Sequence, residues 1–150
     1  MKFNRIWAMP NSQTFKIKPI KEFVERNLIE GVDRPWTQVV VDPFANDSKY
    51  GTITNDLNTN YFTDYHMDAL DFLRMLDTEC ADVVIYDPPY SLRQVVECYK
   101  GVGREVTQET TRSSWRARHL DEIKRILKPG GKALCFGWNS NGVRKLQRLS

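Results

Sequence analysis

Two apolar runs rich in β-branched residues each end at an aspartate followed by proline. Residues 37–41 lead into Asp42-Pro43, and residues 82–86 lead into Asp87-Pro88. Runs of this length and composition predict buried strands, and proline ends each one because it cannot donate to a sheet ladder. Helical patterns stand between such runs, so we expect an α/β fold with a mostly parallel sheet and helices on both faces.

The rest of the apolar periodicity extends this alternation of strands and helices. Apolar residues at three- and four-residue spacing predict helices over residues 19–30, 68–76 and 115–127. Further short strands are expected at residues 51–55 and 132–138, with a weak strand or turn at residues 65–67.

Acidic residues recur where these strands end. Asp42, Asp56, Asp68 and Asp87 each follow a strand or a strand-like segment. Ligands of parallel sheets bind outside the carboxyl ends of the strands, which meet at one edge of the sheet. We therefore expect the four carboxylates to converge on one ligand site.

The tetrapeptide Asp87-Pro88-Pro89-Tyr90 carries the most specific chemistry. The two prolines remove backbone donors and stiffen the chain, so nearby carbonyls remain as acceptors. Asp87 adds a carboxylate acceptor and Tyr90 adds a flat ring for stacking. Such a group suits an exocyclic amine on a planar ring. The alternative is an ordinary proline turn with an incidental acid and tyrosine.

With these residues the chain resembles the amino-group DNA methyltransferases that use S-adenosylmethionine (AdoMet), over about residues 15–138. The resemblance implies a Rossmann-like AdoMet-dependent methyltransferase fold. It also implies cofactor contacts from a segment before the first helix, the loop after the first strand, and the acidic strand ends. The corresponding residues are Phe15, Lys18, Asp42, Phe44, Ala45, Asp56, Asp68 and Ala69.

The resemblance also implies a reaction. In this family, a tetrapeptide that begins with Asp is typical of enzymes that methylate the N6 amine of adenine in DNA, so the resemblance implies that reaction. The target base would leave the helix, and its amine would bond to Asp87 and the Pro88 carbonyl. Tyr90 would stack on the ring, and Phe44 would line the same pocket.

The loop after the first strand departs from the family pattern. The family has a glycine-rich turn there, which lets the backbone approach the cofactor. Here residues 45–51 contain a single glycine, Gly51. Asn46 tolerates a positive φ, so it can preserve the turn, and Asp47 is a further candidate contact for the cofactor amine.

The length of the chain sets a second departure. Its 150 residues fit a single domain, residues 1–150, with no separate target-recognition domain. Residues 139–150 suffice for a loop and one helix, so the sheet is expected to lack its last two strands. The fifth strand would then present an exposed edge. Such an edge favours a homodimer or pairing with a partner subunit.

The positive charge lies in the last third of the chain and indicates contact with DNA. Residues 101–150 carry 11 Lys and Arg against 4 Asp and Glu, whereas residues 1–100 carry 11 against 15. A solvated helix face is the alternative interpretation of this charge. After the tetrapeptide, the polar segment 91–114 offers candidate phosphate contacts at Arg93, Lys100, Arg104 and Arg112.

Several classes are disfavoured by composition. Cys80, Cys98 and Cys135 are scattered and odd in number, which argues against a disulfide framework or a metal site and favours a cytoplasmic protein. No apolar run is long enough for a membrane span or a secretory signal.

Two other functions remain open. The first keeps the enzyme class but changes the substrate to RNA or to the N4 amine of cytosine. The second is a non-catalytic remnant of the methyltransferase fold that binds nucleic acid or a partner.

Overall fold

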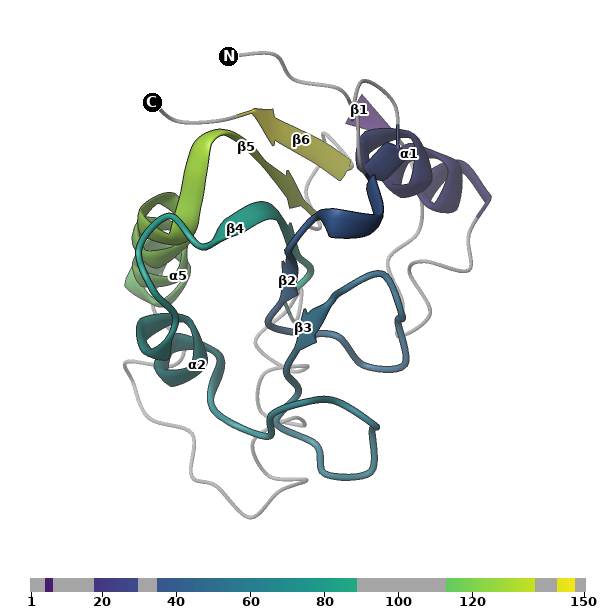
Figure 1. The fold of residues 1–150 in the computed structure, drawn as a ribbon. Helices are drawn as coiled ribbons and strands as arrows, with labels where there is room; N and C mark the ends of the chain where they lie inside the picture. Colours follow the sequence, from purple (N-terminus) through teal and green to yellow (C-terminus); the bar gives the residue numbers. More distant parts are fainter. Residues whose placement is uncertain (1–4, 7–17, 30–34, 89–112, 137–142, 148–150) are drawn as a thin grey trace.

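The structure is a computed structural model that describes residues 5–6, 18–29, 35–88, 113–136 and 143–147 (Figure 1). The strands are β1 (Arg5–Ile6), β2 (Val40–Asp42), β3 (Ile53–Thr54), β4 (Ala81–Tyr86), β5 (Leu127–Cys135) and β6 (Val143–Gln147). The helices are α1 (Lys18–Ile29), α2 (Ala69–Met75) and α5 (Ser113–Ile126), with a 3-10 turn, η2 (Pro35–Thr37). None of the described helices has both the length and the apolar character needed to span a membrane.

One sheet joins these strands in the order β1-β6-β5-β4-β2-β3. The central strands β3, β2, β4 and β5 run parallel to one another, with Val41 opposite Val84 and Val84 opposite Ala133. From β2 the chain passes first to β3 on one side and then to β4 on the other. This reversal between β2 and β4 creates a topological switch point, where open α/β sheets bind their ligands.

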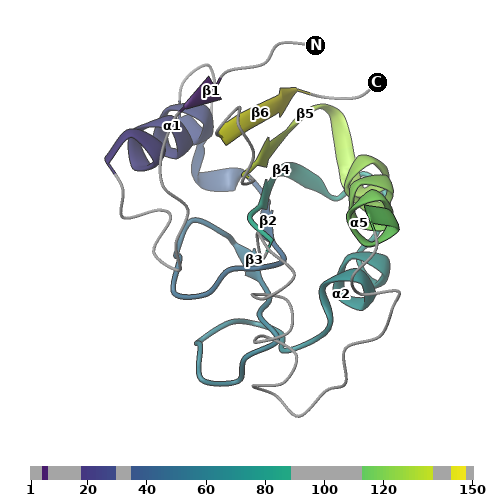
Figure 2. The same cartoon turned by 180° about the vertical axis from the view of Figure 1, so that it is seen from behind.

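Alternating side chains of the parallel strands pack into two apolar clusters, one on each face of the sheet. One cluster joins the strands to α2 and α5 and contains Val41, Val84, Tyr86, Ala133, Phe72, Leu73, Ile123 and Ile126. The other joins them to α1 and contains Val40, Val83, Ile85, Leu134, Phe23 and Val24. Figures 1 and 2 show α1 on one side of the sheet and α2 and α5 on the opposite side. The expected α/β architecture with helices on both faces is confirmed, and it is compatible with a Rossmann-like fold.

The starts of two strands differ most from those predicted. The strand expected from residue 37 begins at Val40, because residues Pro35–Thr37 form the 3-10 turn η2. The strand expected from residue 132 begins at Leu127, directly after α5, and its pairing with β4 shifts register between Ala81 and Val83. The segment Lys128-Pro129-Gly130-Gly131 is therefore part of β5 and does not separate the helix from the strand. Gly130 has a φ of 87°, a backbone conformation that glycine adopts at little cost.

The predicted exposed edge at the fifth strand is wrong. Residues Val143–Gln147, expected to be part of a loop and helix, form β6, which pairs antiparallel with Lys132–Cys135 of β5. The strand β1 pairs in turn with β6, Arg5 lying opposite Arg144. β6 thus takes up the hydrogen-bonding groups of Lys132–Cys135 on this side of β5, and β1 lies on the far side of β6. The edge of β5 on which self-association was predicted is covered.

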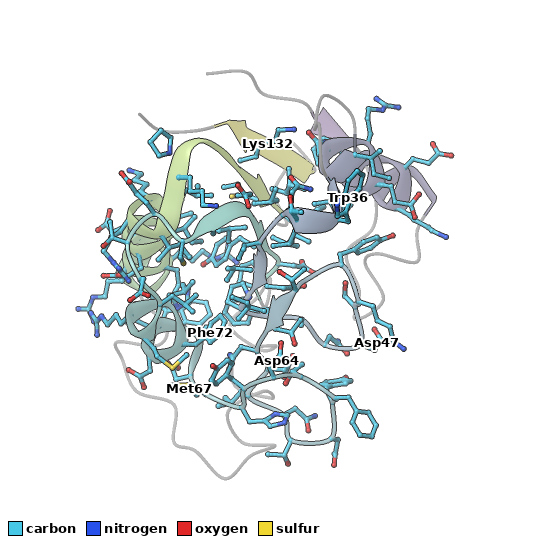
Figure 3. All side chains as sticks on the ribbon, in the orientation of Figure 1. Trp36, Asp47, Asp64, Met67, Phe72 and Lys132 are labelled. Atoms are coloured by element: carbon cyan, nitrogen blue, oxygen red, sulfur yellow. The ribbon has the colours of Figure 1, made fainter. Side chains whose placement is uncertain are left out.

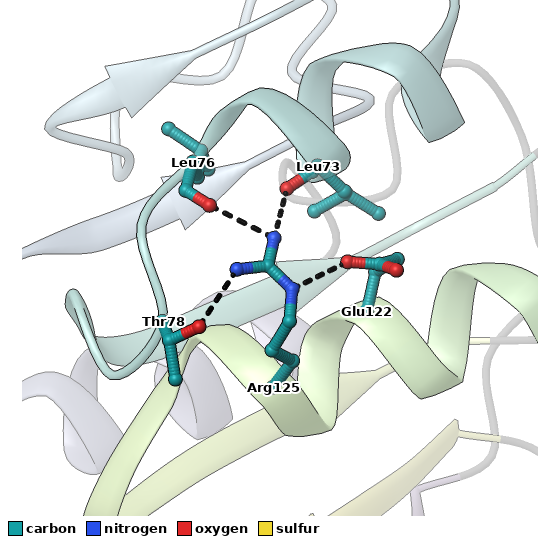
Figure 4. Close-up of polar contacts among 5 residues, drawn as sticks. All are labelled: Leu73, Leu76, Thr78, Glu122 and Arg125. Carbon is teal, nitrogen blue, oxygen red and sulfur yellow. Dashed lines mark hydrogen bonds and ion pairs between the residues drawn. The ribbon is translucent and has the colours of Figure 1, made fainter.

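A clamp centred on Arg125 joins α5 to the end of α2 (Figure 4). The Nη2 atom donates to the carbonyls of Leu73 and Leu76, at 3.0 and 2.8 Å. Nη1 donates to Thr78 at 3.1 Å, and Nε pairs with Glu122 at 2.6 Å. The Leu73 carbonyl also accepts from the Leu76 N–H at 3.2 Å, and the guanidinium adds a donor to it and to the Leu76 carbonyl at the end of α2. The clamp fixes the helix that begins beside the carboxyl edge of the sheet.

Candidate active site

Three of the four predicted carboxylates gather at the switch point. Asp42 is the last residue of β2, Asp87 directly follows β4, and Asp56 follows β3 by two residues. The charges of both Asp87 and Asp56 raise the pKa of Asp42, so each of the two side chains lies within electrostatic reach of Asp42. The parallel register of β2 with β4, and of β2 with β3, therefore brings these acids together from separate strands.

Asp42 has an unusual environment for a carboxylate. Its exposed fraction is 0%, and neither oxygen has a hydrogen-bond partner at bonding geometry among the described residues. Burial raises its pKa well above the ordinary value, with a further contribution from Asp87, while the nearby backbone N–H of Phe44 lowers it without closing a full bond. A buried, unpartnered carboxylate is costly in the ionised form. The site therefore favours a neutral acid or a bound group that brings a donor or positive charge.

The single glycine of the β2–β3 loop lies against this acid. A Cβ atom added to Gly51 would lie 2.9 Å from the Asp42 Cβ and 2.9 Å from Thr54 Cγ2. Gly51 thus lets the loop return over Asp42 into β3. Asn46, a residue type that tolerates a positive φ, has a φ of 53° here. Asp47 is exposed on this loop, as Figure 3 shows.

Asp56, predicted to contact the cofactor, also holds the neighbouring loops. Its Oδ2 atom accepts from the Asn46 N–H at 2.9 Å and its Oδ1 atom from the Asn58 N–H at 2.8 Å. Burial raises the pKa of Asp56, and these two hydrogen bonds lower it in part. A carboxylate has about four acceptor positions, so each oxygen can accept another hydrogen bond.

A buried amide that the sequence analysis missed links the strand ends. Asn55 is 1% exposed, and its Nδ2 atom donates to the carbonyls of Pro43 and Met67 at 3.1 and 2.9 Å. Its Oδ1 atom accepts from the Met67 N–H at 2.9 Å. Asn55 therefore joins the segment after β2 to the segment before α2. The sequence offered one signal for this role. Asn55 stands beside Asp56 at the end of a strand, and its side-chain amide can both donate and accept hydrogen bonds.

The start of α2 lies beside this link. Asp68 is the N-cap of α2, and its Oδ1 atom accepts from the Leu70 N–H at 3.1 Å. The side chains of Ala45 and Ala69, both predicted to contact the cofactor, are buried at 0% and 4% exposure. Any contact of these two alanines with a ligand would have to come from the backbone.

On the α5 side of the sheet, an aromatic cluster underlies the same edge. The ring centroid of Phe44 lies 5.9 Å from that of Tyr86, 6.0 Å from that of Trp115 and 5.7 Å from that of His119. Trp115 and His119 approach to 4.4 Å, and the Tyr86 hydroxyl lies 2.8 Å from His119 Nδ1. Phe44, predicted to line the base pocket, is half-buried and shares its ring contacts with this cluster.

Burial shifts both titratable members of this cluster. His119 is 0% exposed, and burial lowers its pKa to about 4, with Asp68 opposing and Arg116 adding to the shift. Burial likewise raises the pKa of the Tyr86 phenol. Both side chains are therefore neutral at pH 7. The sequence analysis did not identify this pair, which lies 33 positions apart in the chain.

Of the tetrapeptide predicted to be catalytic, the structure describes Asp87, which is half-buried, and Pro88, which is buried. Lys18 is described by its backbone, as the first residue of α1. The other predicted site residues lie outside the described part of the chain, namely Phe15, Pro89, Tyr90, Arg93, Lys100, Arg104 and Arg112.

Comparison of the chain with models of known protein families and with curated proteins finds no match. The function must therefore be inferred from the residues and the geometry of the site.

Proposed function

We propose that this chain transfers a methyl group from S-adenosylmethionine to the N6 amine of adenine in DNA. The observation that carries the proposal is the position of Asp87-Pro88 at the end of β4, beside the buried and unpartnered carboxyl group of Asp42. Asp87 and Pro88 begin the tetrapeptide whose acceptors suit a planar amine. They lie at the switch point, where folds of this topology bind ligands.

The acidic strand ends fit the proposed cofactor. AdoMet would supply a methyl group made electrophilic by a positively charged sulfur, together with an ammonium group and ribose hydroxyls. Among the described residues neither oxygen of Asp42 has a donor at bonding geometry, and because Asp42 is 0% exposed a ligand would reach it only if the covering loop shifted. A cationic or N–H-bearing group of the cofactor would then offset the cost of burying this acid. Asp56 can accept a hydroxyl in addition to the two loop amides that it already holds.

Binding of the substrate amine would depend on hydrogen-bond acceptors at the end of β4. The carboxylate of Asp87 and the carbonyl of Pro88 would hold the two N–H groups of the target amine, and this polarises the nitrogen toward attack. A base inside a duplex cannot reach them, so the adenine would have to leave the stack. Most of the rate enhancement would come from holding the amine and the methyl donor in line.

A methylation assay tests the proposal directly. The purified chain is incubated with AdoMet carrying a labelled methyl group and with DNA, and the bases are separated by chromatography. We expect N6-methyladenine from the wild type and none from Asp87→Ala, with AdoMet binding largely kept. Asp121→Ala, at an exposed position on α5, makes the same side-chain change away from the site and should keep full activity. Retained activity in Asp87→Ala would contradict the assignment.

The same assay separates the alternative substrates. Methylated RNA, or N4-methylcytosine in place of N6-methyladenine, would show that the chemistry is right and the substrate wrong. The non-catalytic alternative draws on the complete burial of Asp42 and on the two amides already bound to Asp56. Calorimetric titration decides this point, because the absence of AdoMet binding at millimolar cofactor would favour that alternative.

A further inference from the structure

The hydrogen bond between Tyr86 and His119 lies directly behind the predicted catalytic acid. Tyr86 is the last residue of β4, and Asp87 is the next residue in the chain. The Tyr86 hydroxyl is 2.8 Å from His119 Nδ1, with Tyr86 4% and His119 0% exposed. Neither side chain can reach a ligand itself, so any effect on the reaction must pass through the backbone.

The contacts of Tyr86 hold it from two directions. Its carbonyl accepts from the Phe136 N–H at 2.8 Å, which fixes the main chain against the end of β5. Its ring packs against Phe44 at 5.9 Å and His119 at 5.7 Å, in tilted and edge-on arrangements. Ring packing alone permits sliding along the ring planes, whereas the hydrogen bond adds a directional restraint at the far end of the side chain.

His119 is held equally firmly on α5. Its ring lies 4.4 Å from Trp115, one helical turn before it, and 5.7 Å from Phe44. The His119 Nε2 atom is buried and has no hydrogen-bond partner in the part of the chain that the structure describes. Placing an imidazole here therefore has a desolvation cost that two apolar rings would avoid. What the polar pair adds is direction, since it sets the position of α5 relative to the last residue of β4.

We propose that the Tyr86–His119 hydrogen bond is a positioning contact that holds Asp87 and the Pro88 carbonyl at the geometry needed for methyl transfer. This inference rests on the proposed function. Tyr86 and His119 act through the backbone at the end of β4, so they are positioning residues. The Phe44 ring connects the same cluster to the end of β2, which carries Asp42.

Three variants separate a positioning role from a purely structural one. Tyr86→Phe and His119→Phe each remove one partner and leave the other buried without a hydrogen bond. The double variant removes both polar groups while retaining two rings. Removing one partner of a buried pair is destabilising, whereas replacing both by apolar groups of similar shape is nearly neutral. Both single variants should therefore lose melting temperature, and the double variant should regain most of it.

Activity should follow a different pattern from stability. We expect kcat to fall about tenfold or more in both single variants and in the double variant, because sub-ångström misplacement of reacting groups is costly. The AdoMet dissociation constant, measured by calorimetry, and the KM for DNA should stay within about twofold of wild type, since no ligand contact is removed. Tyr50→Phe is the matched control. It deletes a phenol hydroxyl that bonds Glu25 at 3.2 Å, from a ring packed on the α1 side, and should keep kcat.

The outcomes are distinguishable. A double variant that regains both melting temperature and kcat would show a structural role alone and overturn the inference. Tyr86→Phe with the kcat of Tyr50→Phe would overturn it as well, while the proposed function would stand. No methyl transfer by the wild type would overturn the proposed function, and the inference would fall with it.

Discussion

Gly51 passes so close to Asp42 that a Cβ atom at position 51 would lie 2.9 Å from the Asp42 Cβ. This contact explains why the loop keeps a glycine at its end although its other positions depart from a glycine-rich pattern. The glycine allows the chain to return from β2 to β3 while covering a carboxyl group that is 0% exposed. The loop and the buried acid therefore depend on each other.

Replacement of Gly51 by alanine should destabilise the fold. The added methyl group meets Asp42 and Thr54 at distances that side chains do not tolerate, so the loop has to shift. The cost should be about 1–3 kcal/mol in the free energy of unfolding, measured by urea denaturation. Calorimetry should also show weaker AdoMet binding, because the shift displaces Asp42.

Gly130→Ala provides the control for this variant. Gly130 has a φ of 87°, and a Cβ atom added there would have nothing within 4 Å, so alanine costs stability through backbone strain alone. AdoMet affinity should be unchanged in Gly130→Ala. Equal affinities in Gly51→Ala and wild type would contradict the link between the loop and the cofactor site.

Asp42→Asn should remove a pH dependence of stability. The folded-state pKa of Asp42 is raised, chiefly by burial and next by Asp87, so the folded protein binds this proton more tightly than the unfolded chain. The stability it contributes is fully present below the unfolded pKa of about 3.9, and it is lost as pH rises toward the folded pKa. Asparagine does not titrate.

Denaturation of both proteins across this pH range measures the effect. The wild type should lose stability relative to Asp42→Asn as the pH rises above about 4, until the folded carboxyl group has ionised. The difference between the two unfolding free energies isolates Asp42 from the other groups. Parallel profiles for the two proteins would show that Asp42 does not titrate with a raised pKa.

Asn55→Ala should separate the loops at the carboxyl edge of the sheet. The substitution leaves the Pro43 carbonyl, the Met67 carbonyl and the Met67 N–H without their amide partner. We expect a loss of about 2–4 kcal/mol in unfolding free energy, since unsatisfied buried groups carry most of the cost. Asn60→Ala, at an exposed position of the next loop, should change stability by less than about 0.5 kcal/mol. Similar melting temperatures for the two variants would argue against the link.

Arg125→Lys should weaken the clamp between α5 and α2. Lysine has a single ammonium group, which cannot reach the two carbonyls, Thr78 and Glu122 together as the planar guanidinium does. The expected loss is about 1–2 kcal/mol in unfolding free energy. Arg74→Lys makes the same exchange at an exposed position of α2 and should have almost no effect. Equal stability of the two variants would show that the clamp contributes little.

Local sequence patterns predicted the two strands whose ends carry the candidate site. The β-branched runs ending at Asp42-Pro43 and Asp87-Pro88 correspond to β2 and β4, because a buried parallel strand needs apolar side chains on both faces. Parallel strands place their carboxyl ends at one edge, so the gathering of strand-end acids was predicted. The adjacency of β2 and β4, which sets Asp42 beside Asp87, was not predicted. The residue type at position 46 indicated that a positive φ was tolerated there, whereas the positive φ of Glu79 had no such signal.

The features that could not be predicted depend on pairing between distant segments. Residues Arg5–Ile6 and Val143–Gln147 meet at the two ends of the chain, and neither short run carries a signal for its partner. The helical periodicity of α5 indicates an inward face, but it does not show that His119 meets the hydroxyl of Tyr86. Asn55 looks like an ordinary polar residue at a strand end until its three partners are placed.

His119 should make the protein sensitive to acid. Burial lowers the pKa of His119 to about 4; the charge of Asp68 opposes this shift, and the charge of Arg116 adds to it. The ring nitrogen Nδ1 faces the neutral Tyr86 hydroxyl. Because the folded-state pKa lies below the unfolded value of about 6.5, stability from the neutral imidazole is fully present above pH 6.5. That stability is lost as the pH falls from about 6.5 to about 4. Over this interval the wild type should lose about 3 kcal/mol in unfolding free energy relative to His119→Phe.

The two buried groups act in opposite directions, which allows them to be separated. Asp42 stabilises the fold toward low pH and His119 toward high pH, so the net profile of the wild type alone identifies neither. Subtracting the profile of His119→Phe from that of the wild type cancels the contribution of Asp42, which both proteins share. A difference that stays constant between pH 4 and pH 7 would contradict a buried, neutral His119. A difference that grows with pH across this range would support it.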